Sequence, residues 1–327
     1  MEHGMPDHAT IEAAIALAVR APSVHNSQPW RWRVGDRSVH LWLDPTRALP
    51  ATDPDQREML LSCGAALHHF TIASAASGWS SVVRRLPNPA EPNHLAAVEL
   101  VPHRATPHDL ALCSAITARR TDRRHYAPEP IPPGYLALLV ERANKLGATL
   151  RPVADPERER LLDIARAAAA EHEQDPDYLY ELTIWSGRHS SPDGVPARNA
   201  PIPRSQDDLP ARHFAGARLH DAASEPDAAR LLVLATAADD RVSRLRAGEA
   251  LSAVLLTATN IGLASCTLTE PLEIPRSRDS VRRAVLGGSA DPQAILRVGW
   301  APTDAPPLPP TPRRAPTEVL DPFESIT

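Results

Sequence analysis

The pattern of hydrophobic and polar positions in the first 105 residues predicts a short α+β unit. Its predicted elements are a helix over 11–20, a hairpin over 31–34 and 38–43, a long helix over 55–77, and strands over 79–86 and 95–101. Thr10 is the expected N-cap of the first helix, which ends at Ala21-Pro22 because the residue before a proline avoids the α region. Gly78 closes the long helix as a left-handed C-cap.

The pattern after residue 105 predicts a second unit with more helices. The predicted helices cover 109–120, 134–146, 157–173, 240–261 and 279–286, and the predicted strands cover 148–153, 229–237 and 294–300. Residues 174–225 differ, because they are rich in Pro, His, Asp and Ser, with Trp185 and Phe214 among them. A long structureless loop is uncommon unless it is functional, so this stretch is interpreted as an ordered insertion or lid.

Alternation of helices and strands favours an α+β or α/β fold. The two halves, 1–105 and 106–327, show no obvious sequence repeat. Each half nevertheless carries a long Ala-rich helix that ends in glycine, AALHHFTIASAASG over 65–78 and ALSAVLLTATNIG over 250–262. This shared feature indicates an internal structural duplication.

Composition removes several classes of function. The 327 residues carry a net charge of −5 and 43% hydrophobic residues, a balance that indicates neither nucleic acid nor an anionic membrane as a partner. No uninterrupted apolar run is long enough to span a bilayer, and the polar N-terminus is unlike a signal peptide, so we expect a cytoplasmic protein. Three cysteines, far apart, give neither a disulfide framework nor a metal site.

Four segments could carry chemistry. The sequence APSVHNSQPWRWRV, 21–34, places short polar side chains and free backbone amides in a turn between a helix and a strand. These side chains belong to Ser23, His25, Asn26, Ser27 and Gln28. An ordinary polar turn is an equally good interpretation from spacing alone.

The second segment, ARRTDRRHY over 118–126, surrounds Thr121 with arginines at the end of a helix. Guanidinium groups such as those of Arg119 and Arg123 bind phosphate bidentately, and a hydroxyl adds a further bond. Taken alone, the segment is better interpreted as solvated charge near a helix C-terminus, where the helix dipole favours cations.

The remaining two segments lie near the C-terminus. In NIGLASCTLTEPLE, 260–273, small residues let a planar ligand approach the backbone, although a glycine cap before an edge strand explains them as well. In the tail, 298–320, prolines stiffen the chain so that Arg313-Arg314 could reach back to a distant site; a disordered tail is the alternative.

The order of these segments resembles that of the nitroreductase-like flavoproteins. APSVHNSQPWRW resembles their APSxxNxQPW turn, ARRTDRR their RRSxR phosphate motif, IGLASC their GLGSC flavin loop, and VGWAP followed by PRR their basic terminus. The APSxHNxQPWRW form and the chain length resemble, more narrowly, the Acg type of NAD(P)H nitroreductases. The resemblance covers nearly the whole chain.

The resemblance implies an FMN site shared between two nitroreductase-like halves. In that family FMN lies at a dimer interface, and here the turn precedes the arginine motif by about a hundred residues, which implies a fused pseudo-dimer, monomeric, with one FMN. The implied FMN-binding residues are Ser23, His25, Asn26, Gln28, Arg119, Thr121, Arg123, Ala264, Ser265, Cys266, Thr267, Thr269, Arg313 and Arg314. Arginines would bind the phosphate, and the flavin itself would perform the hydride chemistry.

The implied activity is reduction of a small-molecule nitroaromatic or quinone-like acceptor with NAD(P)H. Two departures raise alternatives: Thr269-Glu270-Pro271 replaces the family's Gly-Gly-Phe, and the 174–225 insertion could close over the flavin. A carboxylate at Glu270 would repel nicotinamide phosphates. Both features also suit an FMN-binding or storage protein with little turnover, or a flavin-fragmenting enzyme. Glu58 is interpreted only as a first-turn helix acid.

Overall fold

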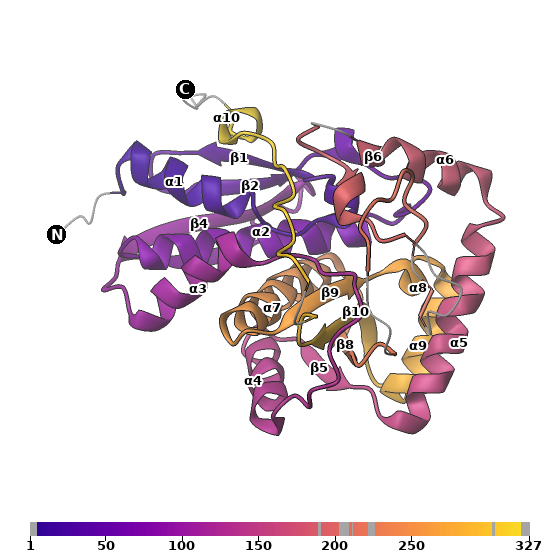
Figure 1. Cartoon of the computed structure of the whole chain (residues 1–327). Helices are drawn as coiled ribbons and strands as arrows, with labels where there is room; N and C mark the ends of the chain where they lie inside the picture. The colour runs from indigo at the N-terminus through magenta and orange to yellow at the C-terminus, as the bar shows by residue number, and fades with distance from the viewer. Residues whose placement is uncertain are drawn as a thin grey trace.

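The computed structural model describes residues 5–188, 191–202, 209–210, 212–221, 226–302 and 305–321 (Figure 1). It confirms the α+β class. The N-terminal half forms an antiparallel four-stranded sheet in the order β1-β2-β4-β3. Its strands are β1 (Trp30–Val34), β2 (Val39–Leu43), β3 (Trp79–Arg85) and β4 (His94–Pro102).

The C-terminal half contains a second antiparallel sheet in the order β5-β8-β10-β9. Its strands are β5 (Thr149–Pro152), β8 (Arg230–Thr236), β9 (Ala264–Leu268) and β10 (Asp291–Gly299). In both sheets the first strand in sequence pairs with the second, the second with the fourth, and the fourth with the third. The two halves therefore share one topology, as the paired Ala-rich helices indicate.

The helices follow the same scheme. A helix precedes the first strand of each sheet, α1 (His8–Ala18) and α4 (Pro133–Asn144), and a long helix follows the second, α2 (Arg57–Ala76) and α7 (Arg241–Asn260). Figure 1 shows α2 and α7 lying between the two sheets. Helix α2 is long and apolar enough to cross a membrane by composition, but 78% of its apolar window is buried inside the protein, which is the environment of a core helix.

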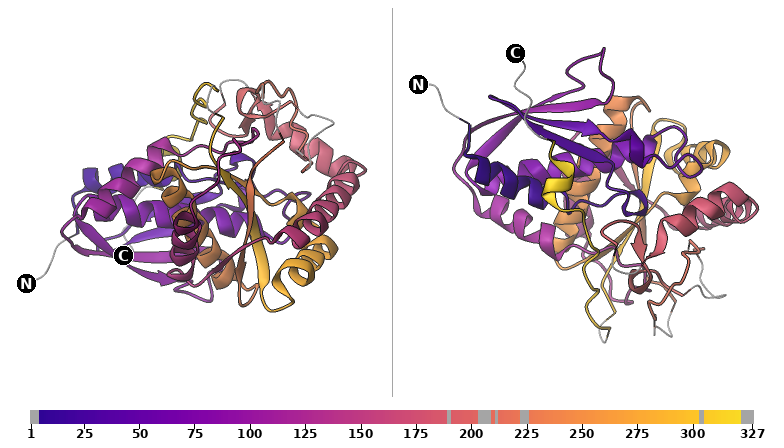
Figure 2. Two further views of the ribbon diagram at one scale, coloured as in Figure 1. Left: turned by 60° about the horizontal axis from the view of Figure 1, so that its bottom comes forward. Right: turned by 90° about the horizontal axis from the view of Figure 1, so that it is seen from above.

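The C-terminal half contains further segments beside these sheets and paired helices. They comprise α3 (Pro107–Ala118), α5 (Asp155–His172), α6 (Pro176–Ile184), β6 (Ser186–Arg188), β7 (Val195–Pro196), α8 (Glu270–Glu273) and α9 (Pro275–Leu286). The 174–225 insertion thus contains a helix and two short strands. Residues 189–190, 203–208, 211 and 222–225 of it lie outside the described residues. Figure 2 shows the same arrangement from two further sides.

The tail returns to the N-terminal half, which decides between the two interpretations of residues 298–320. Its helix α10 (Pro316–Val319) contacts α1 and β1, and the Asp321 amide donates to the Trp32 carbonyl at 2.8 Å. The Asp321 carboxylate also pairs with Arg31 and Arg33. Proline stiffness therefore positions an ordered strap here (yellow in Figure 1).

Two local predictions need correction, and two short helices were not predicted. Asp7, not Thr10, caps α1: its carboxylate accepts the Thr10 amide at 2.8 Å, and a charged oxygen at a helix N-terminus is also favoured by the dipole. Helix α9 begins at Pro275, four residues before the predicted start, because proline suits the first helical position. The single-turn helices α8 and α10 are too short to show a periodic pattern.

Candidate functional site

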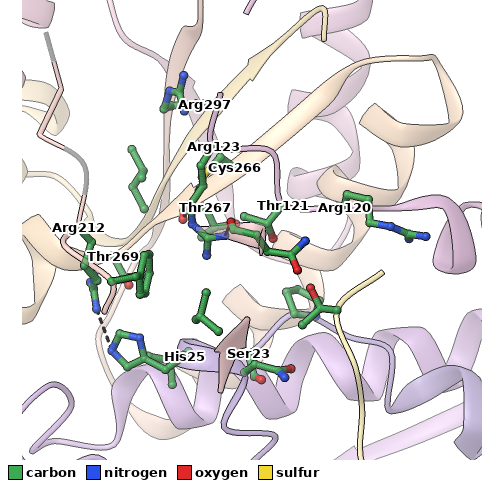
Figure 3. Close-up of a pocket in the computed structure, with 18 of the residues that line it drawn as sticks. Ser23, His25, Arg120, Thr121, Arg123, Arg212, Cys266, Thr267, Thr269 and Arg297 are labelled. Atoms are coloured by element: carbon green, nitrogen blue, oxygen red, sulfur yellow. Dashed lines mark hydrogen bonds between the residues drawn. The ribbon is translucent and has the colours of Figure 1, made fainter. Parts of the chain in front are cut away.

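A cavity opens between the two halves and encloses about 1820 Å³ of space, counting its open mouth. Much of its wall comes from the turn after α1, the start of α2, the segment after α3, the segment from β9 into α8, the 174–225 insertion, and the tail. Figure 3 shows side chains from several of these segments facing one space. The predicted residues that line it are Ser23, His25, Asn26, Arg119, Thr121, Arg123, Cys266, Thr267, Thr269 and Arg313. Gln28, Ala264, Ser265 and Arg314 do not line it.

The turn after α1 is built from unusual backbone conformations. His25, Asn26 and Gln28 have φ values of 46°, 56° and 52°, in the left-handed region that non-glycine residues rarely adopt. The Ser23 hydroxyl stabilises the turn by accepting the Gln28 amide at 3.0 Å. The turn therefore holds Ser23, His25 and Asn26 in the cavity wall at some cost in backbone strain.

Asn26 and Gln28 tie other segments to this turn. The Asn26 side-chain amide lies 3.1 Å from the carbonyl of Gly194 and 3.2 Å from that of Pro312, so it joins insertion and tail, while its Oδ1 is buried without a partner. The side-chain Nε2 of Gln28 donates to the Pro192 carbonyl at 2.9 Å. The side-chain Oε1 of Gln28 accepts the Arg314 backbone amide at 2.9 Å. Gln28 and Arg314 thus bind each other outside the cavity lining.

Four arginines gather at one end of the cavity. Burial, followed by the charges of Arg120 and Arg20, lowers the pKa of Arg119 to about 10. Burial, followed by Arg119, Arg20 and Arg120, lowers the pKa of Arg313 to about 9. The Nε atoms of Arg20, Arg119 and Arg313 are buried without a hydrogen-bond partner.

No carboxylate within the described ranges forms an ion pair with Arg20, Arg119, Arg120 or Arg313. Buried like charges without a counter-ion are unfavourable, so this end of the cavity favours an anion. Guanidinium groups match a phosphate monoester in both charge and geometry. Sequence reasoning missed Arg20; its only signal is an arginine at the end of the helix predicted over 11–20, just before Ala21-Pro22.

Arg123 lies apart from this cluster, although the sequence groups it with Arg119. Its Nη1 donates to the Asn199 carbonyl at 3.1 Å, and its guanidinium lies 5.0 Å from the centre of the Phe214 ring. Both contacts are made to the insertion. Arg123 therefore joins the phosphate-motif segment to the insertion, and its role in binding phosphate stays a prediction.

The segment around β9 forms a further wall. Thr121 and Ser265 form a β-bridge, and the Asp122 amide donates to the Ser265 carbonyl at 2.9 Å, so the arginine segment is bonded to β9. Ser265 forms this bridge, and both Ala264 and Ser265 pair with β10. The side chains beyond them, from Cys266 to Thr269, reach the cavity, and burial raises the pKa of the Cys266 thiol.

Glu270 does lie in the cavity wall, but its charge is compensated. Its carboxylate lies 3.8 Å from Arg212 Nε and 3.6 Å from His172 Nδ1, and it accepts the Tyr178 hydroxyl at 3.4 Å. Arg212 also forms a 2.5 Å ion pair with Glu273. The pKa of Glu270 is lowered by Arg212 and by His172, against the effect of burial.

The same Arg212 links the insertion to the N-terminal turn. Its Nη1 lies 2.9 Å from His25 Nε2, the contact drawn dashed in Figure 3. Burial, Arg212 and Arg123 hold the pKa of His25 well below its ordinary value, so the ring is neutral and accepts this hydrogen bond. Phe214 of the insertion lines the cavity, whereas Trp185 packs near the Arg47 guanidinium instead.

Sequence reasoning also missed Glu58. It is indeed an acid in the first turn of α2, but it is 3% exposed and lines the cavity. The available signal was its place at the head of an otherwise apolar helix. Among the described residues no group of three or more His, Cys, Asp or Glu side chains is placed to hold a metal ion.

No family model matches the chain. The Mycobacterium tuberculosis protein named "Putative NAD(P)H nitroreductase Rv3131" is 49% identical over 324 residues, covering 98% of this chain and 94% of the relative. The protein of the same organism named "Putative NAD(P)H nitroreductase acg" is 42% identical over 316 residues, covering 95% of each.

Solved structures with a detectable likeness include two nitroreductases. One, from Bacteroides fragilis with bound FMN, is 16% identical with a TM-score of 0.38 and covers 60% of this chain and 90% of its own. The other, NfnB from Mycobacterium smegmatis in complex with NADPH, is 17% identical with a TM-score of 0.38 and covers 66% of this chain and 95% of its own.

Proposed function

This chain belongs to the Acg-type NAD(P)H nitroreductase family, and we propose that it is an FMN-dependent oxidoreductase that passes electrons from NAD(P)H to a small nitroaromatic or quinone-like acceptor. The class of reaction is inferred from the names of these relatives. The observation that supports the cofactor is the cluster of four arginines without a described counter-ion at one end of the cavity.

The arginine end of the cavity fits the phosphate of FMN. Arg20, Arg119 and Arg313 keep buried donors that no described group accepts, and a phosphate monoester offers the acceptors they lack. The Asn26 Oδ1, also buried without a partner, is an acceptor suited to a ribityl hydroxyl or a flavin N–H. When bound, FMN would supply the hydride chemistry, and the chain would position it and exclude water.

The residues that line the cavity come from both halves of the chain, which supports a fused pair of halves. Residues 1–105 contribute the turn and Glu58, and residues 106–327 contribute the arginine segment, the β9 segment and the tail. In a homodimer these would come from two subunits. The shared strand order of the two sheets agrees with that origin. The proposed molecule is therefore a monomer with one FMN, because its dimer-like contact is internal.

A second candidate function is FMN binding or storage with little turnover. The supporting observation is that many residues of the insertion line the cavity. Arg212 of the insertion is also hydrogen-bonded to His25 of the N-terminal turn. A covered flavin would meet nicotinamide slowly. Anaerobic bleaching of the bound flavin by NADPH separates the two functions, because only the oxidoreductase bleaches readily. A flavin-fragmenting enzyme would instead lose flavin absorbance irreversibly in oxygen.

The phosphate assignment is tested by titrating the flavin-free protein with FMN and with riboflavin. Arg119→Ala removes one charge-assisted hydrogen bond, so FMN affinity should fall by about 1.5–3 kcal/mol, while riboflavin affinity changes little. Arg84→Ala, an exposed arginine paired with Glu99, is the matched control and should change neither affinity. Equal binding of FMN and riboflavin by the parent protein would contradict the assignment.

A further inference from the structure

One carboxyl group in the cavity wall has no bonding partner. Glu58 is 3% exposed, and its Oε1 and Oε2 are both buried without a hydrogen bond to any described residue. It lines the same cavity as Thr267 and Thr269. A buried carboxylate without donors is very unfavourable, whereas a protonated carboxyl avoids that cost and keeps one O–H to give.

The carboxyl groups around Glu58 act in the same direction as its burial. Burial is the main reason that the pKa of Glu58 lies well above its ordinary value, and the carboxyl groups of Glu273 and Asp53 raise it further. Arg212 and the Thr269 hydroxyl lower it. Arg212, however, is already bound to Glu273 at 2.5 Å, so it neutralises that carboxylate first. Burial without donors and the neighbouring carboxyl groups thus favour the protonated form of Glu58.

Two other polar groups near Glu58 are engaged. His25 accepts a hydrogen bond from Arg212, so its ring nitrogen already uses its lone pair. The Tyr178 hydroxyl donates to Glu270, and the pKa of Tyr178 is raised far above its ordinary value by burial. Glu58 differs from both, because neither of its carboxyl oxygens has a partner within hydrogen-bond distance among the described residues.

We propose that Glu58 is the catalytic acid of this cavity and gives its carboxyl proton to an oxygen of the acceptor. This inference rests on the proposed function. A quinone that takes up a hydride and one proton becomes a hydroquinone, with the reduced nicotinamide as the ultimate source of the hydride. The Glu58 O–H bond breaks, the acceptor O–H bond forms, and water at the cavity mouth returns a proton to the Glu58 carboxylate.

The first test needs no flavin. The flavin-free protein, labelled with ¹³C at the glutamate carboxyl carbon, is titrated by NMR in the parent and in Glu58→Gln. We expect one carboxyl resonance, absent from Glu58→Gln, to titrate well above the ordinary 4.5. Glutamine has the shape of a protonated glutamate, so the variant should fold. Titration of that resonance near its ordinary value would overturn the inference.

The second test follows the acceptor. Flavin-loaded protein is reduced with dithionite and mixed anaerobically with 1,4-benzoquinone, and recovery of flavin absorbance is recorded. Glu58→Gln should slow recovery by about 10²-fold, a usual contribution of a general acid. The parent rate should fall as pH rises through the pKa of Glu58, whereas the variant rate should not. FMN affinity and bleaching by NADPH should stay within about twofold of the parent, because neither consumes this proton.

Glu249→Gln is the matched control for Glu58→Gln. Glu249 is equally buried at 3% exposure, but its carboxylate is paired with Arg85 away from the cavity, so Glu249→Gln should leave the recovery rate unchanged. A parent that holds FMN while Glu58→Gln recovers as fast as the parent overturns this inference alone. A parent that holds no FMN overturns the proposed function, and the inference with it.

Discussion

Gly64 of α2 and Gly248 of α7 face each other where the two long helices cross. A Cβ on Gly64 would come within 2.9 Å of the Gly248 Cα and would overlap the Leu245 carbonyl oxygen; a Cβ on Gly248 would overlap the Leu61 carbonyl in the same way. Each glycine is the eighth residue of a 20-residue helix, and each faces a carbonyl three residues before its partner. The crossing is therefore nearly symmetric, as between two identical subunits.

Replacing either glycine should destabilise the packing of α2 against α7. Gly64→Ala forces the backbones of α2 and α7 apart, and overpacking of this kind costs about 1–3 kcal/mol and occasionally more. We expect the free energy of unfolding, measured by urea denaturation, to fall by about 3 kcal/mol. Gly134→Ala in α4, where a Cβ meets nothing within 4 Å, is the control and should be neutral or slightly stabilising. Equal stability of the two variants would argue against the close crossing.

The same symmetry governs a buried histidine. His68 and Ser252 are the twelfth residues of α2 and α7, and His68 Nδ1 lies 2.8 Å from the Ser252 hydroxyl. Burial lowers the pKa of His68 from 6.5 to about 4. Between those values the unfolded chain binds a proton that the folded protein does not, so stability should fall as the pH drops through this window.

For His68 alone the loss amounts to about 3 kcal/mol between pH 6.5 and 4. His68→Gln keeps a hydrogen-bonding side chain that does not titrate, so its unfolding free energy should depend on pH less steeply by that amount. Urea denaturation at a series of pH values measures this. The exposed His8 provides the control variant, His8→Gln, whose pH dependence should match the parent. Parallel curves for His68→Gln and the parent would refute the prediction.

Arg20 tests the anion site with a residue that the sequence motifs did not indicate. Its charge lowers the pKa of both Arg119 and Arg313, which places it within the cluster. Arg20→Ala should weaken FMN binding by about 1.5–3 kcal/mol and leave riboflavin binding nearly unchanged, as measured by fluorescence titration. Arg314→Lys keeps the charge of an arginine outside the cavity and should bind FMN as the parent does. A similar loss for both flavins in Arg20→Ala would indicate a structural role instead.

Much of the fold could be predicted from the sequence because it depends on local pattern. The long helices α2 and α7, the hairpin of β1 and β2, and the turn at Ser23 each follow from periodicity or from a compact motif. The arginine end of the cavity could be predicted in part, since Arg119 lies in a motif.

The rest depends on contacts between residues far apart in the chain. His25 and Arg212 are 187 positions apart, and nothing in either neighbourhood indicates the other. Glu58 gives the ordinary signal of a first-turn acid, because the groups that act on its carboxyl, such as Glu273 and Arg212, lie far away in the sequence. Glu270 was expected to present a free charge, and its compensation by Arg212 and His172 likewise depends on tertiary packing.

Because the charge of Glu270 is compensated, repulsion by this carboxylate is no longer the expected reason for slow access of NADPH to the flavin. Because Arg212 and His172 already offset the charge of Glu270, neutralising it should matter little. On the proposal that the insertion covers the cavity, this cover should limit entry instead. Arg212→Ala removes the bonds from the insertion to His25 and Glu273 together. Loss of one bond to a charged group is worth about 1.5–3 kcal/mol, so opening of the cover should become at least about tenfold more frequent.

The measurement is the anaerobic rate at which NADPH bleaches the bound flavin. Arg212→Ala should bleach about tenfold faster than the parent while FMN stays bound, and Glu270→Gln should bleach within about twofold of the parent, since its charge is already offset. Arg198→Ala is the matched control, because Arg198 lies exposed on the same insertion and contacts only the Pro310 carbonyl, at 3.4 Å, among the described residues. If Glu270→Gln alone accelerated bleaching, charge and not the cover would limit access. If Arg212→Ala bleached no faster than Arg198→Ala, the insertion would not close the cavity through this bond.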